Sequence, residues 1–235
     1  MSGNACCSGL NREVHLALTP LVRGVLVLGV LVSHPALGET RVGIIGGESW
    51  CTLLEENGYE CSNLPSTGPD GPLDTYDVLI NVSRDWSDPE GMLAEFMRAG
   101  KGVITWSDVP RVLGINSDPT VQAWIGANAW VQTSGALLST ARDPILGTLP
   151  VGTVVLDCGF SVCPALRDTS GHPGAKALAA FGGPESPFIG ILRNTWEGGQ
   201  SVYFTDYISP GYPLDDEIIL NAVRVLSQTI PAVSE

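Results

Sequence analysis

The sequence predicts an α/β protein with a doubly wound, mostly parallel sheet and a late hairpin. Two observations lead to this class. Apolar runs typical of buried strands alternate with helical segments over residues 41–106, which is the pattern of a parallel sheet with right-handed crossovers. Two strand-like runs joined by a Gly-Gly turn then occupy residues 187–208, as in an antiparallel hairpin. A length of 235 residues suits one sizeable domain.

The first three elements lie between residues 41 and 65. The apolar run RVGIIGG (41–47) is typical of a buried parallel strand. The segment ESWCTLLEENGY (48–59) predicts a short helix that ends at Gly58, and YECSNLP (59–65) predicts the second strand. A loop rich in Gly and Pro follows.

The third strand, the next helix and the fourth strand complete this alternation. The run YDVLINV (76–82) predicts the third strand. Residues 87–102 predict a helix with Asp88 as its N-cap, because a side-chain oxygen there can accept from the free N–H groups of the first turn. The fourth strand, 103–106, runs into Ser107.

The second half of the chain has a weaker pattern. Residues 121–182 predict short strands or a small helix at one side of the sheet. The hairpin follows, and residues 214–228 predict a final amphipathic helix with acidic residues at its start.

Composition and charge exclude some partners. The hydrophobic content of 44% can form a buried core, and the formal net charge is −13. An acidic surface without a Lys/Arg run repels phosphate backbones, so we expect no nucleic-acid partner.

Residues 1–38 predict an export segment. An apolar stretch from Val25 to Val32 is preceded by Arg23 and followed by the small-residue pattern Ala36-Leu37-Gly38, which is typical of a signal-peptidase site. We therefore expect cleavage near Gly38 and a mature domain of residues 39–235, periplasmic or extracellular and without a membrane span. A membrane anchor formed by the uncleaved segment is the alternative.

Four cysteines follow the export segment: Cys51, Cys61, Cys158 and Cys163. An even number in an exported chain favours disulfides. Cys158 and Cys163 are close in one irregular stretch and can close a small loop. Cys51 is expected in a helix at one edge of the sheet and Cys61 in a strand at the other edge, which argues against joining these two.

Five segments in this order resemble the ThuA-like (trehalose-utilisation-like) family: LDTYDVLINV (73–82), DPEGMLAEFMRAGKGVITW (88–106), ARDPILGTLP (141–150), WEGGQSVYFTDYI (196–208) and IILNAVRVL (218–226). The resemblance covers residues 41–226. The family lies within the class I glutamine amidotransferase-like superfamily, so the resemblance implies a flavodoxin-like sheet and a carbohydrate-related ligand.

Ser107 occupies the position at which the resemblance implies a catalytic cysteine. In amidotransferases of this superfamily the strand ends in a G-x-C-x-G turn, whereas this chain has Thr105-Trp106-Ser107-Asp108-Val109. The superfamily's histidine-containing ending is absent too, since Thr205-Asp206-Tyr207 stands there. We expect no glutaminase activity. A hydrolase using Ser107, Asp108 and Asp206 is the enzymatic alternative, and His172 is the only histidine after the export segment.

Several side chains directly follow predicted parallel strands and should therefore meet at one edge of the sheet. We predict ligand binding by the following residues: Glu48, Trp50, Arg84, Asp85, Trp86 and Tyr207. Aromatic faces and charged hydrogen-bonding groups suit a sugar or glycan. No G-x-G-x-x-G, Walker or histidine-cluster pattern occurs, so we expect no cofactor and no metal.

The leading hypothesis is thus an exported domain that binds a small molecule or glycan. The hydrolase and an interaction module for another envelope protein remain alternatives.

Overall fold

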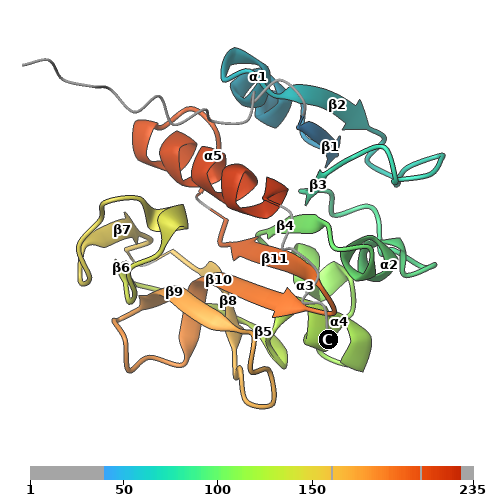
Figure 1. Cartoon of the computed structure of the whole chain (residues 1–235). Helices are drawn as coiled ribbons and strands as arrows, with labels where there is room; N and C mark the ends of the chain where they lie inside the picture. The colour runs from blue at the N-terminus through green and yellow to red at the C-terminus, as the bar shows by residue number, and fades with distance from the viewer. Residues whose placement is uncertain (1–39, 160, 207, 229–235) are drawn as a thin grey trace, which may run out of the picture. The chain divides into compact units, whose positions relative to one another are not determined.

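The computed structural model describes residues 40–159, 161–206 and 208–228, and the predicted export segment lies outside them. Five strands form the parallel half of the sheet (Figure 1). In spatial order they are β2 (Glu60–Leu64), β1 (Arg41–Ile45), β3 (Val78–Asn81), β4 (Gly102–Trp106) and β11 (Gly199–Phe204). This half has the doubly wound arrangement that the sequence predicted.

Six further strands make the sheet mixed. They pair antiparallel and are β5 (Ala129–Thr133), β6 (Ala136–Ser139), β7 (Val154–Asp157), β8 (Cys163–Arg167), β9 (Lys176–Phe181) and β10 (Phe188–Trp196). The order continues from β11 through β10, β9, β6 and β7, while β8 pairs with both β10 and β5. The irregular second half of the sequence therefore forms an antiparallel extension of the sheet.

The predicted hairpin joins β10 to β11, with Trp196 opposite Gly199. Its two turn residues are Glu197 (φ 46°) and Gly198 (φ 91°). Positive φ at both positions is the type I′ geometry that matches the twist of paired strands. The turn is thus Glu-Gly, and Gly199 already belongs to β11.

Helices cover both faces of the sheet. On one side lie α1 (Glu48–Glu56), α5 (Pro213–Ser227) and the 3-10 helix η2 (Pro144–Leu146); on the other lie α2 (Met92–Arg98), α3 (Val109–Val112) and α4 (Pro119–Ile125). No helix among the described residues is long and apolar enough to cross a membrane.

Alternate residues of β4 point into two separate cores, as strand geometry requires. Ile104 packs in the core beneath α1 and α5, whereas Val103 packs in the core beneath α2 and α4. Gly102 permits close packing of α5, because a Cβ there would lie 2.6 Å from Cβ of Leu226.

Helix α2 begins at Met92, later than the sequence predicted. Gly91 has a left-handed φ of 69° and interrupts the segment. The Asp88 carboxylate still accepts from the N–H groups of Met92 (2.7 Å) and Leu93 (3.0 Å), and burial raises its pKa. Asp88 therefore acts on the first turn from outside the helix.

The described residues contain two disulfides. Cys158 is joined to Cys163, as the sequence predicted. Cys51 is joined to Cys61, with a Cα–Cα distance of 5.5 Å, so the prediction against this pair was wrong. β2 is the direct neighbour of β1, and α1 packs beside it. A helix rises only about 1.5 Å per residue, so the short remainder of α1 brings Cys51 close to the start of β2.

Candidate functional site

A polar cavity of about 400 Å³ lies at the carboxyl ends of the parallel strands, the edge at which ligands bind in doubly wound sheets. We call it the strand-end cavity. Its lining residues are Arg84, Ser107, Asp108, Arg111, Trp130, Gln132, Val162, Pro164 and Asp206.

Ser107 lies on the sharp turn between β4 and α3. Its φ is +56°, in the left-handed region that residues other than glycine rarely adopt, and its side chain is fully buried. Its N–H donates to the carbonyl of Phe204 (2.8 Å), which continues the pairing of β4 with β11. A residue held in this way between strand and helix has the geometry of a nucleophile elbow.

Arg84 connects the polar side chains of the strand-end cavity. Its Nε lies 2.6 Å from Oδ1 of Asp108, and its Nη2 donates to Oγ of Ser107 at 3.0 Å. The same nitrogen lies 3.4 Å from Oδ1 of Asp206. Three segments distant in sequence therefore meet through one guanidinium group.

Arg111 makes a second contact to Asp108, with 3.3 Å between its Nη2 and Oδ2. Its guanidinium carbon lies 5.3 Å from the ring centre of Trp130, a cation–π distance. Two cations thus surround the Asp108 carboxylate, while the Trp130 ring lines the cavity beside them.

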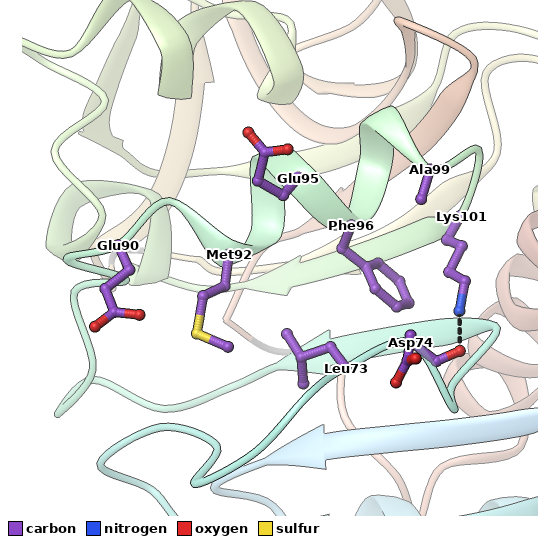
Figure 2. A pocket seen from close by; sticks show the side chains of 8 residues that line it. All are labelled: Leu73, Asp74, Glu90, Met92, Glu95, Phe96, Ala99 and Lys101. Atoms are coloured by element: carbon purple, nitrogen blue, oxygen red, sulfur yellow. Dashed lines mark hydrogen bonds between the residues drawn. The ribbon is translucent and has the colours of Figure 1, made fainter.

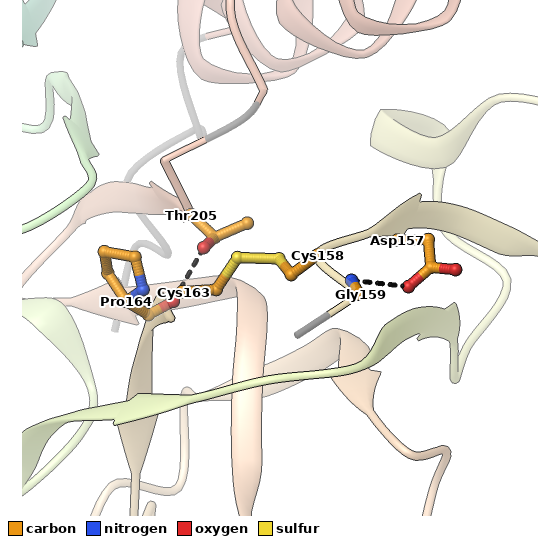
Figure 3. The surroundings of a disulfide bond; sticks show 6 residues. All are labelled: Asp157, Cys158, Gly159, Cys163, Pro164 and Thr205. Atoms are coloured by element: carbon orange, nitrogen blue, oxygen red, sulfur yellow. Dashed lines mark hydrogen bonds between the residues drawn. A yellow bond between two sulfur atoms is a disulfide. The ribbon is translucent and has the colours of Figure 1, made fainter. Parts of the chain in front are cut away.

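The Cys158–Cys163 disulfide supports one wall of the strand-end cavity (Figure 3). It closes the loop that leads to Val162 and Pro164, and both of these residues line the cavity. The Thr205 hydroxyl donates to the carbonyl of Pro164 at 2.6 Å, in a fully buried position. The wall is therefore fixed to the residue that precedes Asp206.

The described residues provide Ser107 with no evident general base. Its hydroxyl donates to Oδ1 of Asp108 at 3.3 Å, but two guanidinium groups engage that carboxylate. Burial raises the pKa of the nearby Tyr203 well above its usual value. His172 does not line the cavity, and its Nε2 lies 2.8 Å from Oδ1 of Asn128.

The structure brings together four of the predicted site residues: Arg84, Ser107, Asp108 and Asp206. Four others lie outside the cavity: Glu48, Trp50, Asp85 and Trp86. Trp50 and Trp86 are only 4% and 6% exposed, because their rings pack in the two cores. Glu48 and Asp85 are exposed to solvent, and Tyr207 lies outside the described residues.

Sequence reasoning missed Arg111 and the wall residues of the cavity. Arg111 lies three positions after Asp108 in a segment with Pro110, a spacing at which opposite charges on a helix meet. Trp130, Gln132 and Pro164 had no comparable signal, because β5 and β8 reach the cavity only through the antiparallel part of the sheet.

No protein-family model and no curated protein sequence matches the chain. Solved structures do. A ThuA-like protein from Bacteroides uniformis matches with a TM-score of 0.57 at 11% identity, over 84% of this chain and 95% of that one. A GMP synthase protein from Thermoplasma acidophilum gives 0.52 at 10% identity, over 80% and 94%. The chain has the ThuA-like, class I glutamine amidotransferase-like fold.

The same fold occurs within a larger protein. The β-galactosidase from Bacillus circulans matches with a TM-score of 0.52 at 15% identity, over 80% of this chain but 31% of that one. At this identity the likeness concerns the fold alone. The fold that the sequence resemblance implied is confirmed.

Proposed function

We propose that this protein is an exported domain that binds a carbohydrate-related ligand in the strand-end cavity and has no glutaminase activity. The observation that carries the proposal is the Arg84–Ser107–Asp108–Asp206 cluster, which lies beside the Trp130 ring. Guanidinium and carboxylate groups can donate to and accept from sugar hydroxyls, while an aromatic ring covers an apolar sugar face.

The accessibility and size of the cavity support this assignment. The side chains of Arg84 and Arg111 are each 54% exposed, so a ligand can reach them without breaking the core. A volume of about 400 Å³ is within the range of small-ligand sites. The occurrence of this fold within a β-galactosidase is a further reason to test sugars first.

Export is supported by the signal-peptide pattern and by the two disulfides, which persist in oxidising compartments. The absence of glutaminase activity follows from the serine in place of cysteine on the elbow and from the engagement of Asp108 by two arginines.

A hydrolase that uses Ser107, Asp108 and Asp206 is the second candidate. The left-handed φ of Ser107 and its hydrogen bond to Asp108 favour it, because strained elbows expose nucleophiles in α/β enzymes.

Thermal-shift screening of the purified protein against mono- and oligosaccharides, with mass analysis of every mixture that gives a hit, separates the two. An intact sugar that raises the melting temperature supports binding, since occupancy stabilises the native state by about 2.7 kcal/mol at one hundred times Kd. A consumed sugar supports the hydrolase, and Ser107→Ala should then abolish turnover. If no sugar shifts the melting temperature, the carbohydrate proposal is wrong.

A further inference from the structure

A second cavity, of about 310 Å³, lies between α2 and the loop that precedes β3 (Figure 2). We call it the α2 groove. Its lining residues are Leu73, Asp74, Glu90, Met92, Glu95, Phe96, Ala99 and Lys101. None of them lines the strand-end cavity. Asp74 and Lys101 precede β3 and β4, so the groove begins at the amino edge of the parallel strands.

The interior of the α2 groove is apolar. Met92, Phe96 and Ala99 follow one another at spacings of four and three residues, so they form a single stripe along α2. Leu73 faces this stripe from the opposite loop, and Figure 2 shows Leu73 and Phe96 between the two ends of the groove.

The rim of the α2 groove is acidic. Glu90 lies at one end and Asp74 at the other, and both side chains are exposed (Figure 2). Glu95 adds a third carboxylate, which pairs with Arg98. The cation among the lining residues, Lys101, is turned inward: its ammonium group donates to the carbonyls of Asp74 and Tyr76 and lies 5.0 Å from the Phe96 ring.

We propose that the α2 groove binds a peptide segment of a partner protein in which an apolar side chain is flanked by Lys or Arg. An apolar interior between two exposed carboxylates is complementary to this arrangement, and the net charge of −13 attracts basic partners in general. The seven residues of α2 span about 10 Å, the length of about three residues of extended peptide.

Fluorescence anisotropy with three labelled peptides, GKLRG, GELEG and GKSRG, tests the proposal on the purified protein. GKLRG should bind, and its affinity should fall as salt rises from about 50 to about 500 mM. GELEG, which reverses the charge, and GKSRG, which removes the apolar side chain, should each bind about tenfold more weakly or less. Absence of saturable GKLRG binding below about 1 mM, or equal binding of all three, overturns the proposal.

Two variants place the binding in the groove. Glu90→Lys reverses one end of the rim, and Ala99→Arg fills the groove at an exposed position where a basic residue suits the helix C-terminus. Each should weaken GKLRG binding about tenfold, whereas Glu55→Lys on the exposed surface of α1 should leave it unchanged. Equal affinity in the groove variants and the α1 control overturns the proposal.

Sedimentation velocity and vesicle binding examine other occupants. A dimer that Ala99→Arg converts to a monomer would identify a second copy of the chain as the occupant and overturn the peptide proposal. Co-sedimentation with phosphatidylcholine vesicles that Ala99→Arg abolishes would overturn it in favour of a lipid surface. Because the groove shares no residue with the strand-end cavity, these outcomes do not depend on the sugar-binding proposal.

Discussion

The strand-end cavity and the α2 groove are of similar size but opposite chemistry. The cavity contains two arginines and two aspartates in mutual contact, whereas the groove has an apolar interior and a carboxylate at each end. In the cavity, ionic groups already satisfy one another, so a ligand must compete for them or share them. In the groove the exposed rim is left to attract a partner. The difference indicates that one fold can offer two independent binding sites.

The largest expected effect is that of Asp108→Ala. This change removes the carboxylate that Arg84 and Arg111 share, so the sugar identified by screening should lose about 2–4 kcal/mol of binding free energy. GKLRG binding at the α2 groove should not change. Isothermal titration calorimetry measures both affinities, with Glu185→Ala as an exposed acidic control. Unchanged sugar affinity would show that the cluster is not the site.

Removal of the Cys51–Cys61 disulfide tests stability without either site. The double change Cys51→Ala and Cys61→Ala should lower the free energy of unfolding by about 3 kcal/mol, because the unfolded chain gains freedom across a separation of 10 residues. Urea unfolding measures this loss. Neither cysteine lines a cavity, so both affinities should persist under native conditions. A selective loss of sugar binding would contradict the separation of the two regions.

Removal of the Cys158–Cys163 disulfide should instead act on one site. Its sequence separation is only 5, so Cys158→Ala with Cys163→Ala should cost about 2 kcal/mol of unfolding free energy. The wall formed by Val162 and Pro164 should loosen, and sugar affinity should fall while GKLRG affinity is retained. Comparing the two double variants by urea unfolding and calorimetry separates lost stability from lost support of the cavity. Identical binding in both would mean that this wall is not needed.

The smallest effect concerns Asp215 in the first turn of α5, which lines neither cavity. Burial raises its pKa to about 6, and the neighbouring Asp216 raises it further. Because the native pKa lies above the usual value of 3.8, the folded state binds the proton more tightly, and stability falls as pH rises from about 4 to about 6.

Asp215→Asn should remove this dependence and raise the free energy of unfolding at pH 7 by about 1 kcal/mol, after allowance for solvent screening of a partly exposed group. Urea unfolding at pH 4 and pH 7 measures the change. A variant that is less stable at pH 7 would indicate that the favourable helix-terminus interaction of the charged Asp215 outweighs its burial.

The parallel half of the sheet could be predicted from the sequence because its signals are local. Each buried strand is a short apolar run, and the carboxyl ends of parallel strands meet at one edge whatever the details of packing. That rule was enough to predict that Arg84, Ser107, Asp108 and Asp206 would lie together. The sequence could not reveal that Trp50 and Trp86 are buried, because the direction of a ring depends on the core around it.

By itself, the sequence determined the alternation of strands and helices, the hairpin, the final helix and the serine at the end of β4, since each depends on neighbouring residues. Only the tertiary structure decided the antiparallel extension, the Cys51–Cys61 pair, the wall that completes the strand-end cavity and the α2 groove. These features join segments that are distant along the chain. Their partners are selected by packing and hydrogen bonding across the whole domain, for which no local pattern exists.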